Sequence, residues 1–560
     1  MAREHGVVVA QTPRARGVQL DLVLSACLLG LGCAYAILFC ASTRDISGHA
    51  IGTDDAYISY RYAQNWVRGH GLVFNPGELV EGYTNLLYVV LMALPVWAKW
   101  DVYAFSVGFN ALCATLMLVV FRRFVRRELG VRLATGGALL LALSPSLWIW
   151  VSSGLETALV VLLQVCIWVL VERVVWQRQR RDLLLLAGVA MALVLTRADG
   201  FVTGVFAALY LVLRSRPKWA AALSGVILAT VLGVMLWRHS YYGDLWPNTY
   251  YAKVSSTLAS RLLSSTRELV GISARQGLLV YLVVIGFGCL SLSMRLVRER
   301  SLGSVRFDEL FPPLWIAYWL YVGGDIFEDR FLVILIPFGI FQLLQLLVEA
   351  SSVALRQLVL AVAVLVPLCV PIREAQYGRG LQPKYDRWIT LGRFLGRHHV
   401  GKVLATSAAG KIPFFSGLAT IDMLGLTDRY IARLDRARFV VGHSKFDPEY
   451  VLSRRPDLIA GWLQNDALDV DSGMSARKYR DAGYAVRLLV NSTPSSAGEQ
   501  DILDVQGCTV ESVALLARRG WSFGVLERSP GPSHSSAECR SDGEQACAAR
   551  AECTRTISLQ

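Results

Sequence analysis

The amino-acid sequence predicts a polytopic α-helical membrane protein with a small α/β domain in its C-terminal part. The chain has 560 residues, 54% of them hydrophobic, and a mean hydropathy of +0.43. Long apolar runs with few charges recur between residues 20 and 371, which is the pattern of membrane-spanning helices. After Pro371 the apolar runs shorten to strand length and charged residues become more frequent. This composition excludes a wholly soluble enzyme.

The net charge of +13 does not indicate nucleic-acid binding. Lys and Arg lie in short patches beside the apolar runs, a pattern that sets the orientation of helices in a bilayer. Arg3, Arg14 and Arg16 precede the first apolar run, so we expect a cytoplasmic N-terminus. That run, residues 20–42, is long enough to span, and no clear small-residue cleavage site follows it. It therefore predicts a span and not a cleaved signal peptide.

The positions of the basic patches along the chain predict about eleven spans, with the first loop and the C-terminal domain outside the cytoplasmic membrane. Residues 86–98 fall short of the ~20 residues that a span needs, so we expect a juxtamembrane helix at the outer interface. Two further runs are short, and we expect this pair to tilt or to bend around Asp199. The predicted spans are residues 20–42, 103–121, 133–151, 157–176, 183–195, 201–213, 219–237, 278–294, 310–323, 332–348 and 355–371.

The chain divides into a predicted membrane domain (residues 1–372), an extracytoplasmic α/β domain (373–526) and a poorly ordered tail (527–560). In the α/β domain, residues 385–398 have the spacing of an amphipathic helix, and short apolar runs between helical patterns predict buried strands. The tail is rich in Ser, Gly, Pro and charge. The predicted strands include residues 403–408, 456–462 and 484–490.

Four of the eleven cysteines lie in the polar C-terminal part: Cys508, Cys539, Cys547 and Cys553. An even number suits one or two disulfides if this part of the chain lies in an oxidising compartment. Their spacing does not resemble a zinc site, and their pairing stays open. The other cysteines lie in or beside apolar runs, where they serve as small hydrophobic residues.

The first outer loop, residues 52–85, begins with the paired carboxylates Asp54 and Asp55. Forming a glycosidic bond needs a base that takes the proton of the acceptor hydroxyl. A carboxylate that is partly desolvated at a membrane interface is more basic than one in water. The pair is therefore a candidate catalytic site, and the alternative is that it caps the following helix.

Polar motifs elsewhere in the membrane domain fall on the same outer face. Arginine geometry suits a lipid phosphate, and aromatic, amide and ammonium groups suit a sugar ring with its phosphate. The alternatives are local ion pairs, headgroup contacts, an interfacial aromatic belt and helix caps. The candidate donor-binding residues are Arg197, Asp199, Tyr251, Lys253, Asp325 and Arg330. The candidate acceptor-binding residues are Tyr57, Arg61, Glu81, Tyr83 and Asn85.

Residues 54–88 resemble the first outer loop of the bacterial GT-C polyprenyl-phosphate-sugar transferases, in particular the mycobacterial terminal arabinofuranosyltransferases. The string is DDAYISYRYAQNWVRGHGLVFNPGELVEGYTNLLY. Weaker matches are SGLET, TRADG, YYGDLWPNTYYAK, GGDIFEDRF and SAAGKIPFFSGLATIDMLGLTD. The resemblance covers most of the chain to about Leu458 and fades beyond Asp501.

The resemblance implies an inverting transfer of a sugar from a polyprenyl-phosphate donor to a glycan or glycoprotein on the periplasmic side of the cytoplasmic membrane. Arabinofuranose is the expected sugar. The implied base is Asp54 or Asp55, with Asp54 favoured. Dependence on a divalent metal stays open, because Arg and Lys can neutralise the leaving phosphate. The alternative function, a flippase or transporter of a lipid-linked sugar, needs polar residues near the membrane midplane, which the sequence lacks.

Overall fold

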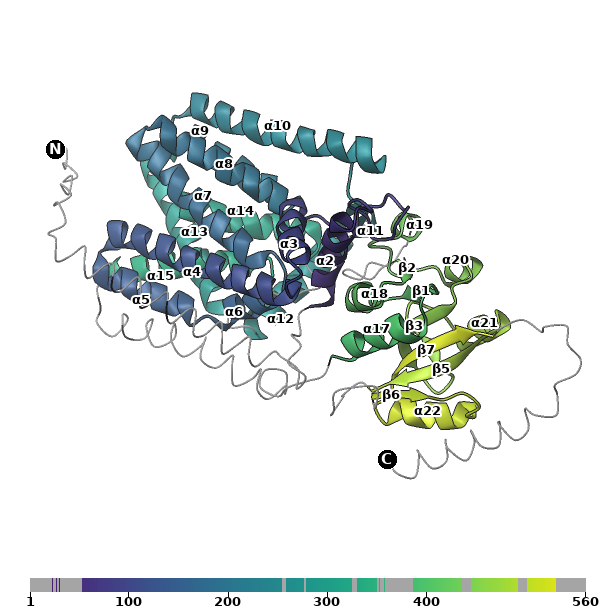
Figure 1. Cartoon of the computed structure of the whole chain (residues 1–560). Helices are drawn as coiled ribbons and strands as arrows, with labels where there is room; N and C mark the ends of the chain where they lie inside the picture. Colours follow the sequence, from purple (N-terminus) through teal and green to yellow (C-terminus); the bar gives the residue numbers. More distant parts are fainter. Residues whose placement is uncertain are drawn as a thin grey trace, which may run out of the picture.

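The computed structural model describes residues 53–253, 258–275, 278–324, 330–349, 386–435, 445–491 and 501–529, together with a few isolated positions. The molecule has a helical part and a smaller part built on a β-sheet, and helix α2 lies where the two meet (Figure 1). The sequence correctly predicts this division into apolar helices and a C-terminal α/β domain.

The helical part consists of α2 (Asp54–Val67), α3 (Leu86–Trp97), α4 (Val102–Leu129), α5 (Val131–Ala142), α6 (Pro145–Ser152), α7 (Thr157–Gln177), α8 (Arg180–Thr196), α9 (Gly200–Leu213), α10 (Pro217–Tyr242), α11 (Asn248–Lys253), α12 (Leu258–Arg275), α13 (Leu279–Glu299), η1 (Leu302–Ser304), α14 (Phe307–Val322), η2 (Val333–Leu335) and α15 (Ile336–Glu349).

Within the described ranges, four helices are long and apolar enough to cross a membrane: α4, α7, α10 and α13. Helices α5 and α6 make a fifth candidate span, bent by 53°. All five coincide with predicted spans, and the chain is a multi-pass membrane protein. Two other predicted spans, residues 20–42 and 355–371, lie almost wholly outside the described residues. The number eleven therefore stays a prediction.

The short apolar runs form short helices. Helix α3 has 12 residues, which agrees with the expected short helix. Helix α8 ends at Thr196 and α9 begins at Gly200, so the two helices are separate elements. The expected tilt or bend of this pair stays a prediction. Helices α14 and α15 have 16 and 14 residues, so length alone does not identify them as spans.

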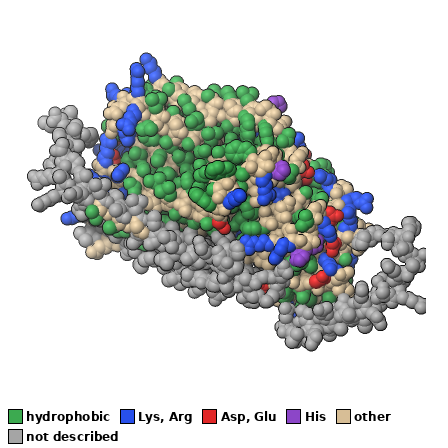
Figure 2. Space-filling model, viewed as in Figure 1, with side chains coloured by type: hydrophobic (Ala, Val, Ile, Leu, Met, Phe, Trp, Pro, Cys, Tyr) green, Lys and Arg blue, Asp and Glu red, His purple; other side chains and the backbone are tan. Residues whose placement is uncertain are grey.

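The surface of the helical part is strongly apolar. On α10, Leu228 and Leu236 are 58% and 68% exposed, and on α13 Met294 is 60% exposed. Figure 2 shows hydrophobic side chains spread over most of this surface and Lys and Arg gathered at its edge. An exposed apolar area of this extent is unfavourable in water and suits contact with lipid tails.

The C-terminal domain is a mixed sheet with strand order β2-β1-β3-β7-β5-β6, and β4 pairs with β3. Strand β1 is parallel to β2 and β3, whereas β7 runs antiparallel between β3 and β5. The predicted helix and the three predicted strands are present. The strands are β1 (Val403–Thr406), β2 (Ala419–Asp422), β3 (Leu458–Gln464), β4 (Asp469–Val470), β5 (Tyr484–Val490), β6 (Ile502–Asp504) and β7 (Phe523–Arg528).

Helices cover both faces of the sheet. Leu391 and Leu395 of α17 pack with Leu404 on one face, and Val513 and Leu516 of α22 pack on the other. Cys508 is disulfide-bonded, and the tail beyond Ser529 lies outside the described residues. The domain's helices are α17 (Arg387–His398), α18 (Lys411–Ser416), α19 (Arg429–Ala432), α20 (Pro448–Ser453), α21 (Ala476–Asp481) and α22 (Val510–Arg518).

Candidate active site

Asp54 is the first residue of α2 and lies directly against the C-terminal domain. Its carboxylate accepts hydrogen bonds from the backbone N–H groups of Gly410, at 2.9 Å, and Lys411, at 2.8 Å. A Cβ atom at Gly410 would lie 1.8 Å from the backbone oxygen of Asp54, so this approach requires glycine. The first loop and the start of α18 are therefore joined at the candidate base.

Burial raises the pKa of the Asp54 carboxyl to about 6. The backbone N–H and the charge of Lys411 oppose this rise, while the neighbouring charge of Asp55 adds to it. Asp54 is thus more basic than an ordinary aspartate and still largely ionised at neutral pH. Asp55 follows it on the same helix turn and is half-buried.

Lys411 and an aromatic cluster surround this carboxylate. The Lys411 ammonium forms a buried ion pair with Asp386 and lies 5.8 Å from the centre of the Tyr57 ring. The Tyr57 ring contacts Phe414 and Phe415 of α18, with ring centres 5.3 and 5.5 Å apart. No local pattern selects Lys411, although it lies inside the string SAAGKIPFFSG, which resembles the family. Its importance depends on a contact between residues more than 300 positions apart, which periodicity does not reveal.

Arg61 is only 3% exposed and is held by the protein itself. Its guanidinium donates hydrogen bonds to the carbonyl oxygens of Phe74 and Leu418, both at 2.7 Å, to the Asn75 side chain at 3.2 Å, and to the carbonyl of Pro413. Each of its three nitrogen atoms therefore has a protein acceptor. These contacts join α2, the first loop and the C-terminal domain.

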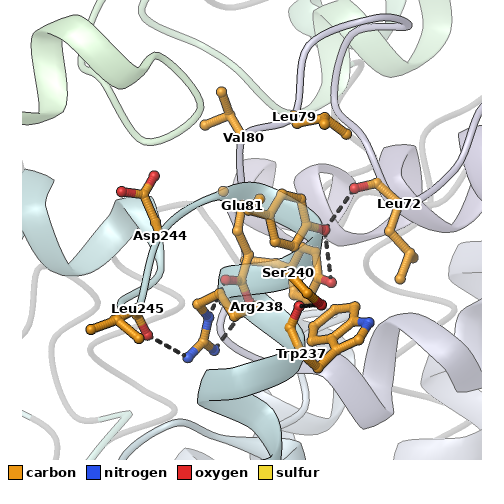
Figure 3. A network of polar contacts seen from close by, with 12 residues as sticks. Leu72, Leu79, Val80, Glu81, Trp237, Arg238, Ser240, Asp244 and Leu245 are labelled. Atoms are coloured by element: carbon orange, nitrogen blue, oxygen red, sulfur yellow. Dashed lines mark hydrogen bonds and ion pairs between the residues drawn. The ribbon is translucent and has the colours of Figure 1, made fainter.

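Glu81 forms a buried two-point ion pair with Arg238 near the end of α10 (Figure 3). Arg238 also donates to the carbonyl of Leu245 at 3.2 Å. The hydroxyl of Tyr83 lies 3.1 Å from that of Tyr242 on the same helix. The second half of the first loop is thus held against the end of α10.

Asn85 links the first loop to the segment between α6 and α7. Its amide donates to the Glu156 carboxylate at 2.9 Å, and its carbonyl oxygen accepts from Ser59 at 3.1 Å. Asn85 and Glu156 are 5% and 4% exposed. The acceptor candidates Tyr57, Arg61, Glu81, Tyr83 and Asn85 are therefore all buried, and their contacts fix the shape of the loop.

The donor candidates Arg197 and Arg330 meet at one aromatic ring although they are far apart in the sequence. Their guanidinium carbons lie 4.1 and 5.7 Å from the centre of the Phe331 ring. Arg197 also makes a two-point ion pair with Asp199, with both N–O distances at 2.8 Å. The structure thus brings three donor candidates together, while Asp325 lies outside the described residues.

Tyr251 and Lys253 lie on α11, beside the C-terminal domain. The Tyr251 ring is 4.3 Å from the guanidinium of Arg433, and its carbonyl accepts from Lys445 at 2.8 Å. Lys253 is exposed. The candidates therefore form separate groups: around Asp54, at the end of α10, at Phe331 and on α11.

Among the residues that the structure describes, no three His, Cys, Asp or Glu side chains come close enough together to hold a metal ion. Both Asp54 oxygens already accept backbone N–H groups. The described residues thus assemble no three-ligand metal site, and no catalytic step is assigned to a metal below.

Comparison with known proteins relates the chain to glycosyltransferases. It is 26% identical over 333 residues to a terminal β-(1→2)-arabinofuranosyltransferase of Mycobacterium tuberculosis, and the match covers 52% of each chain. The chain is distantly homologous to this arabinofuranosyltransferase. Since the match covers 52% of the relative, the chain spans about half the length of this curated protein. The family resemblance seen in the sequence is confirmed.

Solved structures of low sequence identity share the fold. The apo oligosaccharyltransferase of Archaeoglobus fulgidus has a TM-score of 0.55 and 11% identity, covering 85% of this chain and 74% of that one. ArnT from Cupriavidus metallidurans, bound to undecaprenyl phosphate, has a TM-score of 0.53 and 12% identity, covering 93% and 100%. The fold is therefore GT-C-like.

A protein-family model described as a domain of unknown function (DUF8728) matches residues 372–509.

Proposed function

We propose that this protein is a GT-C glycosyltransferase that moves arabinofuranose from a polyprenyl-phosphate donor to a glycan or glycoprotein acceptor, with inversion, at the outer face of the cytoplasmic membrane. The proposal depends most on the Asp54 carboxylate. It lies at the contact between helix α2 and the C-terminal domain, and burial raises its pKa. Homology to the arabinofuranosyltransferase supports the sugar. The undecaprenyl phosphate bound by ArnT supports the lipid donor.

The reaction is a single displacement. The oxygen of an acceptor hydroxyl attacks C1 of the donor sugar, and the bond between C1 and the phosphate oxygen breaks. The electron pair of that bond stays on the polyprenyl phosphate, and the hydroxyl proton passes to Asp54. Attack opposite the leaving phosphate inverts the configuration at C1. Asp54 is the favoured base, and Asp55 is the alternative.

Arg197 and Arg330 are the proposed partners of the donor phosphate. Guanidinium groups bind phosphate oxygens through parallel N–H bonds, and the shared position of these two at Phe331 supports a joint role. Asp199 orients Arg197 through its two-point ion pair. Tyr251, Lys253 and Asp325 remain proposed donor contacts. The buried contacts of Arg61 and Glu81 support a role in positioning the loop on the acceptor side.

We place the N-terminus in the cytoplasm and the C-terminal domain outside, with eleven spans in residues 1–372. The α/β domain runs from residue 373 to the end of β7 at Arg528, two residues beyond the boundary expected from the sequence, and the tail follows it. The basic patches support this orientation. The disulfide at Cys508 also supports an outside location, because disulfides persist in oxidising compartments.

The test is transfer from a radiolabelled polyprenyl-phosphate arabinofuranose by the full-length protein in nanodiscs. We expect Asp54→Asn to lower kcat by about 10²–10⁴-fold, and Asp55→Asn to lower it by less than about tenfold. Thermal unfolding of each variant checks that the fold is retained. Transfer at the wild-type rate by the double variant would refute the proposal that these carboxylates supply the base.

A further inference from the structure

A groove of about 760 Å³ lies between the first loop and the C-terminal domain. Residues 77–80 of the loop form one wall, and residues at α19 and α20 form the other. Its volume is in the range of small-ligand sites. None of the candidate donor, acceptor or catalytic residues lines it, so it is distinct from the groups at Asp54 and Phe331.

Two stacked tyrosines form an aromatic surface in this groove. The rings of Tyr430 and Tyr450 lie 4.2 Å apart at an angle of 23°, and Tyr430 is 49% exposed. The Tyr450 hydroxyl donates to Asp428 at 3.0 Å and accepts from Arg454 at 2.8 Å. These bonds hold the Tyr450 ring, against which the Tyr430 ring stacks. A fixed, exposed ring face suits stacking against the C–H face of a sugar, because the π surface is apolar and carries partial negative charge.

Polar groups with both signs of charge surround the aromatic surface. The Arg454 guanidinium lies 3.7 Å from the Glu78 carboxylate of the opposite wall, and these side chains are 46% and 48% exposed. Arg429 and Arg433 pair with Asp244 at 2.9 and 2.7 Å. Arg429 and Arg433 share the one carboxylate of Asp244, and Asp428 adds a further carboxylate to the lining. Three carboxylates, Glu78, Asp244 and Asp428, thus match the three arginines, so the groove does not present the uncompensated positive charge that a polyanion prefers. Exposed donors and acceptors on facing walls suit a neutral polyhydroxyl chain.

We propose that this groove is a secondary subsite for the acceptor glycan, which holds neutral sugar residues distant from the one that reacts. This inference rests on the proposed transferase function. Tyr430 stacks on a sugar ring, while Arg454 and Glu78 contact its hydroxyls from facing walls. Because one wall belongs to the first loop and the other to the C-terminal domain, a bound chain bridges both parts of the enzyme.

Binding to the full-length protein in nanodiscs, without donor, tests the subsite. The probe is a fluorescent linear arabinofuranose hexasaccharide, measured by fluorescence polarisation. We expect Tyr430→Ala to raise Kd by about tenfold or more, and Tyr430→Phe to change it less than about twofold because the ring face remains. Arg454→Gln should also weaken binding. Its matched control is Arg477→Gln, at a 91% exposed arginine of the same domain, which should bind like the wild type.

Transfer assays separate this inference from the function on which it rests. In Tyr430→Ala we expect a raised KM for the hexasaccharide, and an unchanged kcat and KM for an arabinofuranose disaccharide, which lacks the distal sugar residues that the groove is proposed to hold. Equal Kd values for the wild type and Tyr430→Ala, or no binding of the hexasaccharide to the wild type, would overturn the subsite even if transfer occurs. The protein could instead bind the hexasaccharide through Tyr430 and show no transfer activity. That result would support glycan binding in the groove and reject the proposed transferase function.

Discussion

The Asp54 carboxylate contacts the C-terminal domain and is also the proposed base. A carboxylate has about four lone-pair sites, and the N–H groups of Gly410 and Lys411 occupy two of them. The remaining capacity is enough to accept a proton from a hydroxyl. The same contacts that hold the C-terminal domain therefore hold the proposed base in a defined orientation, which favours proton transfer.

The raised pKa of Asp54 predicts a specific pH profile. The base must be ionised, so kcat/KM for transfer should be constant above about pH 7 and fall about tenfold per unit below pH 6. The assay is initial-rate transfer between pH 4.5 and 8. The control Asp55→Asn should keep an inflection but shift it to lower pH, because the charge of Asp55 no longer adds to the pKa of Asp54. Acid unfolding through Asp54 does not explain such a loss, because a carboxyl whose pKa is raised on folding favours the folded state when protonated. A profile that stays flat to pH 5 would contradict Asp54 as the base.

Arg61 should act on stability more than on acceptor binding. Arg61→Lys keeps the charge but loses the planar fork that reaches four acceptors, and should lower the free energy of unfolding by about 1.5–3 kcal/mol for each hydrogen bond that is lost. Thermal unfolding in detergent measures the change, and Arg68→Lys, at an exposed position just after α2, should have little effect. An unchanged Tm with a raised acceptor KM would instead support the direct acceptor contact that the sequence suggests.

The sequence selects Asp54 and Asp55 as candidates but does not show which residues contact them. Charge, position and the matched string all point to the paired aspartates, whereas Gly410 and Lys411 become significant only through tertiary contact. For Arg61 and Glu81, the sequence shows polar residues on an outer loop and does not show that both are buried. Burial of a polar side chain depends on what packs over it, which the local sequence does not contain.

Among the elements, α2 and α18 make the contact that joins the two parts of the molecule. Hydrophobic length predicted the long helices and the break between α8 and α9. The six-residue α18 has no periodic signal that would reveal it. Its place against α2 depends on the missing Cβ of Gly410 and on the aromatic contacts of Tyr57 with Phe414 and Phe415.

Gly410→Ala should separate α18 from α2. The added Cβ would overlap the backbone of Asp54, which cannot move as a flexible side chain could. We expect faster limited proteolysis near residues 399–410 and at least a tenfold loss of transfer. The matched control is Gly233→Ala on α10, where an added Cβ meets nothing within 4 Å. Proteolysis and transfer at wild-type rates in Gly410→Ala would show that this close contact is not needed.

At the scale of the whole molecule, the candidate base Asp54 lies where the membrane helices contact the C-terminal α/β domain. The sequence predicted both parts, because apolar length and charge distribution reflect the bilayer directly. The grouping of donor candidates at Phe331 and the groove at Tyr430 arise from contacts between distant segments, which a single sequence does not encode locally.

The proposed orientation predicts opposite accessibility for two exposed positions. In intact cells, a membrane-impermeant maleimide should label Arg477→Cys, in the C-terminal domain, and should not label Glu299→Cys, at the end of α13. Both positions are exposed, so accessibility to the reagent reports the side of the membrane. The wild-type protein gives the background from native cysteines. Labelling of Glu299→Cys with protection of Arg477→Cys would reverse the orientation.

The most direct test of the central claim is the product balance of the purified protein in proteoliposomes that contain polyprenyl-phosphate arabinofuranose and an acceptor oligosaccharide. The account predicts one free polyprenyl phosphate for each new glycosidic bond, with the configuration at C1 inverted. Movement of intact donor across the bilayer without a glycosidic product, or release of free sugar alone, would contradict it.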